Sequence, residues 1–147
     1  VLVRDTYGNL YADGSGSQRW PVEEAVDVGL ELARLWQPDG FVIEVNQFQS
    51  LVKAMFLRRV KELGLVPPPV YTVDNRVKKT VRIRRLGSYL ENKTLRLQGG
   101  SSGARILGEQ LMTFPNGDHD DFPDSLEMGL RTMIRLVNTG VTARRRS

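Results

Sequence analysis

The sequence predicts an α/β protein in which a mixed sheet is flanked by helices. Short, largely apolar runs that are typical of strands alternate with longer segments whose apolar residues recur at helical spacing. Their order along the chain is ββαβαβαβαα, the pattern of a sheet that is covered by helices. With 147 residues, the chain is long enough to bury a core. We expect residues 1–140 to form one domain and residues 141–147 to form a flexible basic tail.

The first three elements have clear local signals. Strands are expected at residues 1–3 and 10–12, because Gly8 and Asn9 between them tolerate the positive φ of a tight turn. A helix is expected over residues 21–36, since a proline stands at its start and its apolar residues form one face.

The middle of the chain predicts two strands around a long helix. Residues 41–45 are a short apolar run, typical of a strand that is covered on both faces. A helix follows over residues 48–63 and is ended by Gly64. Three consecutive prolines, which favour extended backbone, then lead into a strand at residues 70–73.

The remaining elements follow the same alternation. The basic stretch 76–86 is expected to enter a helix that reaches about Leu90. A strand at residues 93–97 and helices at residues 104–114 and 122–138 complete the predicted fold.

Composition limits the class of protein. The chain is 40% hydrophobic and 26% charged, as ordinary globular proteins are. No apolar run approaches the roughly 20 residues that span a bilayer, and no signal peptide is visible, so we expect no membrane partner. The absence of cysteine excludes thiolate metal sites and suits a reducing cytosol, but it leaves oxygen-ligand metal sites open. The phosphate-binding motif of P-loop ATPases is also absent.

Charge is distributed unevenly around a net charge of +4. Basic residues crowd one stretch, where the candidate phosphate contacts are Arg76, Lys78, Lys79, Arg82 and Arg85. Further arginines end the chain at positions 144–146. Acids gather most densely at Asp118, Asp120, Asp121 and Asp124. This pattern suits an enzyme that holds a phosphate backbone against a metal centre.

The acidic segment is the strongest candidate site. Asp121 and Asp124 are three residues apart at a helix N-terminus, so both carboxylates share one face. Clustered carboxylates are the oxygen ligands that Mg²⁺ and Mn²⁺ prefer. The alternative is structural: Asp120 or Asp121 caps the helix, and the other acids favour its positive end.

Two further residues are candidates for chemistry. Glu44 is a charged residue within an apolar strand, and such groups are rarely buried unless paired or metal-bound. Its alternative role is a salt bridge or a solvent-facing position at the strand end. His119, the only histidine, is placed to assist as a ligand or to activate water; a loop histidine is otherwise a bystander.

Three segments follow one another along the chain: Tyr-Gly-Asn-Leu-Tyr at 7–11, Ile-Glu-Val-Asn-Gln-Phe-Gln at 43–49 and His-Asp-Asp-Phe-Pro-Asp-Ser-Leu at 119–126. In this order they resemble the C-terminal nuclease domain of phage terminase large subunits, and the resemblance covers nearly the whole chain. The resemblance implies a ribonuclease H-like fold, related to the Holliday-junction resolvases, and a two-metal endonuclease that cuts concatemeric DNA. It also implies double-stranded DNA, an ATPase motor domain, a small terminase subunit and a portal as partners, in the cytoplasm of a host cell.

The resemblance assigns roles by position. Glu44 matches the acid of the central strand and Asp121 the principal acid of the last helix, with Asp124 or Asp120 as neighbouring ligands. Two Mg²⁺ or Mn²⁺ ions about 4 Å apart are implied. The basic stretch around Lys78 lies where the family places DNA-facing charge. Phosphate contacts of this kind predict cutting with little sequence preference and strong salt sensitivity.

One departure from the family concerns its first catalytic aspartate, which lies on a strand ahead of the first hairpin. This sequence begins inside that hairpin, so we expect the fold to lack the first strand. Asp5 and Asp13 are the nearest carboxylates and neither is well placed. Weak metal binding and little or no cleavage are therefore expected of this chain. Two alternatives stay open: a resolvase-like nuclease on branched DNA, and a non-catalytic module that binds DNA or a partner.

Overall fold

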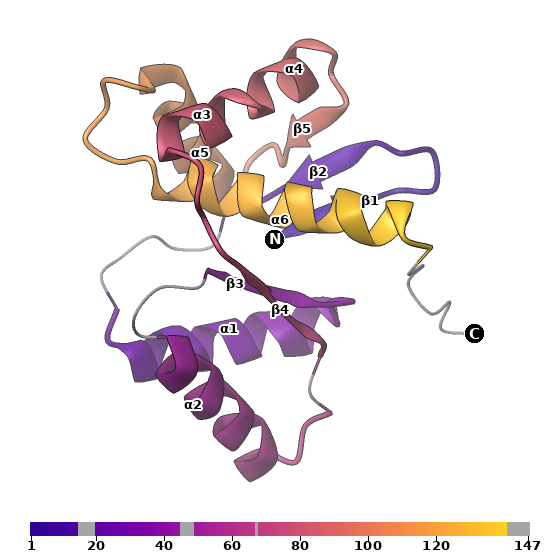
Figure 1. Ribbon diagram of the computed structural model, residues 1–147, viewed down its shortest axis with the longest axis vertical. Helices are drawn as coiled ribbons and strands as arrows, with labels where there is room; N and C mark the ends of the chain where they lie inside the picture. The colour runs from indigo at the N-terminus through magenta and orange to yellow at the C-terminus, as the bar shows by residue number, and fades with distance from the viewer. Residues whose placement is uncertain (15–19, 45–48, 67, 141–147) are drawn as a thin grey trace. The chain divides into compact units, whose positions relative to one another are not determined.

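The computed structural model describes residues 1–14, 20–44, 49–66 and 68–140, apart from the side chains at 49 and 50 (Figure 1). The strands are β1 (Leu2–Arg4), β2 (Leu10–Ala12), β3 (Phe41–Glu44), β4 (Val70–Val73) and β5 (Leu95–Leu97). The helices are α1 (Val22–Trp36), α2 (Gln49–Glu62), α3 (Lys79–Arg84), α4 (Leu86–Glu91), α5 (Ser102–Thr113) and α6 (Asp121–Asn138). The predicted α/β class is confirmed. Residues 45–48 of the family-like segment and the predicted tail 141–147 lie outside the described residues.

Each predicted strand and helix has a counterpart near its expected position, with one difference in the basic stretch. The helix expected to reach Leu90 is divided at Arg85 into α3 and α4. Arg85 itself has helical backbone angles, φ −63° and ψ −26°, so the division is a slight one. No glycine or proline marks the break in the sequence, which is why it was not predicted.

The described strands form two sheets. In the first, β2 lies in the middle, antiparallel to β1 and parallel to β5. In the second, β3 and β4 are parallel. The first sheet is thus mixed, as predicted, whereas the ribonuclease H-like arrangement remains a prediction. None of the described helices is both long and apolar enough to cross a membrane.

The chain divides into two compact units, each with its own apolar core. The first comprises Val1–Gln18 and Arg76–Ile134. Its core lies on one face of the β1-β2-β5 sheet, where alternate strand residues are buried. Leucines of α4, α5 and α6 pack on that face, so helices cover it; the buried members are Leu10, Ala12, Leu86, Leu95, Leu107, Leu126 and Leu130.

The second unit comprises Arg19–Asn75 and Arg135–Ser147. Its core joins the paired helices α1 and α2 to the β3-β4 sheet. The rings of Phe41 on β3 and Phe56 on α2 lie 5.1 Å apart at 49°, an arrangement that favours aromatic contact. The ring of Tyr71 on β4 packs directly against Gly40, where any side chain would overlap it.

Helix α6 contributes residues both to the core of the first unit and to the candidate site. Its apolar face is buried against the first sheet, as the amphipathic sequence predicts. The same helix also buries two acids, Asp124 and Glu127. Buried carboxylates require partners, and those partners define the site.

Candidate functional site

The start of α6 is held in place by α5. Gln110 of α5 is buried, and its side-chain oxygen accepts a hydrogen bond of 3.1 Å from the backbone N–H of Phe122. One turn of the new helix is closed when the backbone N–H of Asp124 donates to the carbonyl of Asp120 at 3.1 Å. These contacts fix the direction in which the acids of the first turn leave the helix.

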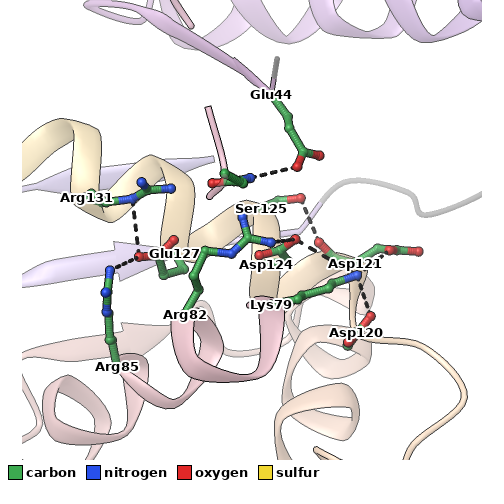
Figure 2. Close-up of polar contacts among 11 residues, drawn as sticks. Glu44, Lys79, Arg82, Arg85, Asp120, Asp121, Asp124, Ser125, Glu127 and Arg131 are labelled. Atoms are coloured by element: carbon green, nitrogen blue, oxygen red, sulfur yellow. Dashed lines mark hydrogen bonds and ion pairs between the residues drawn. The ribbon is translucent and has the colours of Figure 1, made fainter. Parts of the chain in front are cut away.

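Lys79, the first residue of α3, lies among three of these acids (Figure 2). Its Nζ is 2.5 Å from Asp120 Oδ1, 3.1 Å from Asp121 Oδ1 and 4.0 Å from Asp124 Oδ2. Partial burial lowers the pKa of Lys79, but hydrogen bonds to Asp120 and Asp121 and their negative charges outweigh it. The net pKa of Lys79 is raised. The ammonium group is therefore firmly charged in the folded protein.

Arg82 and Asp124 form a buried ion pair. Arg82 Nη2 donates to Asp124 Oδ2 at 3.0 Å, and the two side chains are only 4% and 8% exposed. The Nε and Nη1 atoms of Arg82 are buried as well and have no hydrogen-bond partner among the described residues. Burying a guanidinium with unmade hydrogen bonds costs free energy. The presence of this buried ion pair therefore does not by itself show that it stabilises the fold.

Glu127 takes the next position along α6. Its Oε1 lies 3.4 Å from Arg85 Nη1 and 3.4 Å from Arg131 Nε, and the Glu127 side chain is 4% exposed. Arg131 is one turn further along the same helix. Two cations therefore balance one buried carboxylate.

These contacts form a regular series that we call the ion-pair ladder. Its three rungs are Lys79–Asp121, Arg82–Asp124 and Arg85–Glu127, and each joins residues 42 positions apart. From one rung to the next, the sequence number rises by three in α3 and by three in α6. The two segments therefore run side by side in the same direction. Both series of charges are visible in the sequence, at i, i+3 and i+6, but Glu127 and Arg131 were not singled out there.

The ladder joins two sets of residues that the sequence analysis had assigned to different ligands. Lys79, Arg82 and Arg85, predicted to contact DNA, are paired with acids of α6. Asp120, Asp121 and Asp124, predicted to hold metal, are paired with those cations. The other two predicted DNA contacts, Arg76 and Lys78, are exposed.

Glu44 belongs to the second unit. It is half-buried at the end of β3, and its Oε1 accepts a hydrogen bond of 2.7 Å from the side-chain amide of Asn75 (Figure 2). The partner is a neutral donor from the segment that follows β4. A hydrogen bond from a neutral amide was not among the roles that the sequence suggested for Glu44.

His119 and Asp118 lie in a different setting from the ladder acids. Both are exposed, and both line an open cavity of about 510 Å³ between α5 and the loop that leads into α6. Glu109 and Gln110 of α5 line the same cavity. His119 thus directly precedes Asp120, one of the acids that contact Lys79, and lines an open surface hollow.

The acids at the start of α6 have the donor atoms that a hard cation prefers. Within the part of the chain that the structure describes, no set of three or more His, Asp or Glu side chains is grouped as metal ligands would be. Carboxylate oxygens of Asp120 and Asp121 nevertheless converge on one cation, the ammonium of Lys79. Carboxylate oxygens are the donor atoms that Mg²⁺ and Mn²⁺ prefer, so these acids are of the right chemical kind for such an ion.

Asp5 and Asp13, the two acids closest to the first hairpin, both have structural partners. Asp5 accepts hydrogen bonds from the backbone N–H of Tyr7 at 2.9 Å and of Asn9 at 2.8 Å, and from the Asn9 side chain at 2.8 Å. It therefore closes the β1–β2 turn. Asp13 accepts a hydrogen bond from the hydroxyl of Ser101, the residue that caps α5.

The Asp5 turn gives a pH-dependent expectation. The Asn9 side-chain amide and, after it, backbone N–H groups outweigh desolvation and lower the pKa of Asp5 below 3.8. A carboxyl group with a depressed folded-state pKa stabilises the fold fully above its unfolded value and loses that contribution as the pH falls through the folded value. NMR titration of the Asp5 carboxyl carbon is expected to give a midpoint below 3.8, and the midpoint should rise in Asn9→Ala. A wild-type midpoint at or above 3.8 would contradict this account.

No protein-family model and no curated protein sequence matches the chain.

Proposed function

We propose that the chain is the metal-dependent DNA endonuclease domain of a phage terminase large subunit. The observation that carries the proposal is the convergence of Asp120 and Asp121 on a single cation at the start of α6. The family-like His-Asp-Asp segment supplies both carboxylates. A helix start that already gathers carboxylates around one positive charge is what a metal-dependent nuclease requires of this segment.

Under this proposal Asp121 and Asp124 hold divalent metal, as their positions in the resemblance imply; the resemblance also assigns Glu44 a metal-binding role. When bound, Mg²⁺ or Mn²⁺ supplies an activated water and stabilises the leaving oxygen of the cut phosphodiester. The protein's own part is to fix the carboxylates. Gln110 fixes the start of α6, and Arg82 restrains the side chain of Asp124 through the bond at 3.0 Å.

DNA would be held through its backbone. Lys78 and Arg84 are exposed and lie outside the ladder, on the segment whose other cations face α6. Phosphate contacts by such residues give binding without sequence preference and with strong salt dependence. The proposed partners are those of the family: double-stranded DNA, an ATPase motor domain, the small terminase subunit and the portal, in the host cytoplasm.

A plasmid-nicking assay tests the proposal. Supercoiled DNA and Mn²⁺ are incubated with the chain and with the same chain carrying a family-like first strand, with its aspartate, joined ahead of Val1. We expect nicking by the extended protein, abolished by EDTA and by Asp121→Ala.

Glu109→Ala is the matched control, because Glu109 is an exposed acid of α5 paired only with Arg105 in the described contacts, and it should leave nicking unchanged. Nicking that survives Asp121→Ala, or none by either protein, would refute the proposal.

A second candidate is a non-catalytic module in which the acids are structural. The ladder itself favours it, because cations of the same unit already balance Asp121, Asp124 and Glu127. A Mn²⁺ titration by calorimetry separates the two. Structural acids should leave no divalent site, whereas binding that is lost in Asp121→Ala supports the nuclease.

A further inference from the structure

We infer that Lys79 is the resident counter-ion of the acids at the start of α6, and that a divalent cation binds these acids by displacing its ammonium group. The inference deepens the proposed function, on which it rests for the identity of the competing cation. It concerns how access of metal to the site is controlled.

The first step is the position of the ammonium group. One nitrogen atom lies within 4.0 Å of oxygens from three different carboxylates, Asp120, Asp121 and Asp124. Like charges this close repel one another unless a cation stands between them. A lysine ammonium is a compact point charge with three donors, so of the basic side chains it most resembles a simple metal cation.

The second step is the contrast in burial along the ladder. The side chain of Lys79 is 34% exposed and that of Asp121 is 75% exposed, so water and ions reach this rung. Arg82 and Asp124, at the next rung, are 4% and 8% exposed. Exposed ion pairs contribute little and exchange readily, whereas a buried pair is costly to separate. Lys79 is therefore the displaceable cation and Arg82 the fixed one.

The third step is charge balance. The three carboxylates carry three formal negative charges, and Lys79 and Arg82 carry two positive charges, which leaves one net negative charge. A divalent cation in place of the Lys79 ammonium leaves none. The three acids together with Arg82 carry two net negative charges, which a divalent cation matches and the single charge of an ammonium group does not.

A pair of neighbouring lysine variants tests the inference. Lys79→Met removes the ammonium but keeps an unbranched side chain, and Lys78→Met makes the same change in net charge at an exposed neighbour outside the described ion pairs. Mn²⁺ affinity is measured by calorimetry without DNA, and the folding of each variant by circular dichroism. We expect Lys79→Met to bind Mn²⁺ about tenfold more tightly than the wild type, and Lys78→Met to change affinity by less than about twofold. Equal affinity in the two variants, or weaker binding by Lys79→Met, would overturn the inference.

A measurement on the unmodified chain covers the case in which Lys79→Met does not fold. The NMR signals of the lysine side chains are followed while Mg²⁺ is added. The Lys79 signal is expected to move toward that of a solvated lysine as the metal binds, while the Lys78 signal stays in place. A stationary Lys79 signal throughout the titration would overturn the inference.

Failure of the inference is distinguishable from failure of the proposed function. Metal binding that competes with Lys79, in a protein that does not nick DNA even with the added strand, supports the inference and refutes the nuclease. Nicking that depends on Asp121, together with metal affinity that is the same in Lys79→Met and Lys78→Met, supports the nuclease and refutes the inference.

Discussion

Asp124→Asn is expected to destabilise the protein by about 3–5 kcal/mol, because it leaves the guanidinium of Arg82 as an uncompensated buried charge. Arg82 is 4% exposed, and its only hydrogen bond among the described contacts is the one to Asp124. Asparagine keeps the shape of the side chain but cannot balance the positive charge. The measurement is urea unfolding, in which the free energy of unfolding in water is extrapolated with the same m-value for the wild type and the variant.

The control for this experiment is the same substitution one turn earlier. Asp121→Asn also removes a carboxylate from the ladder, but Asp121 is 75% exposed and its partner Lys79 is 34% exposed. Its cost should be about 1 kcal/mol or less. The double variant Arg82→Met, Asp124→Leu should recover most of the lost stability, since apolar residues often replace a buried ion pair without loss. Equal losses at the two positions would contradict the assignment of a buried central rung.

Most elements of the fold could be predicted because their signals are local. The amphipathic pattern of α6 and the turn at Gly8, whose φ is indeed +92°, are both carried by neighbouring residues. Pairing between distant strands is different. The parallel register of Leu10 with Leu95 depends on packing that no local segment encodes, and the sequence therefore predicted a mixed sheet without its strand order.

The candidate site could be predicted only as a set of residues. The acids at the start of α6 were recognised because four of them lie within residues 118–124, more than a helix cap requires. Their partners were not, since an arginine has the same appearance in a sequence whether it faces solvent, DNA or a carboxylate. Arg82 was expected on a DNA-facing surface and is instead among the most buried charged residues that the structure describes. The 42-residue offset that relates the two series of charges becomes visible only when α3 and α6 are packed together.

The contact between the loop after β2 and the start of α5 joins Gly14 and Gly103, which lie far apart in the sequence, so no local pattern predicts it. In the structure the two backbones touch. A Cβ atom added at Gly103 would overlap the carbonyl group of Gly14 and lie 2.8 Å from its Cα. The obstacle is backbone rather than a flexible side chain, so it cannot be relieved by a change of rotamer. This close approach brings Asp13 to the hydroxyl of Ser101 and so joins the first sheet to α5.

Gly103→Ala is therefore expected to cost about 3 kcal/mol or more, the upper range for an overpacked site, or to prevent folding. Gly108→Ala on the same helix is the matched control, because its added Cβ would meet only Leu97 Cδ1 at an ordinary 3.6 Å. Alanine has the higher helix propensity, so Gly108→Ala should raise stability by up to about 1 kcal/mol. Thermal unfolding followed by circular dichroism should thus move the two midpoints in opposite directions. If Gly103→Ala were as stable as Gly108→Ala, the two backbones would not be in contact, and the link between the β2 loop and α5 would have to be abandoned.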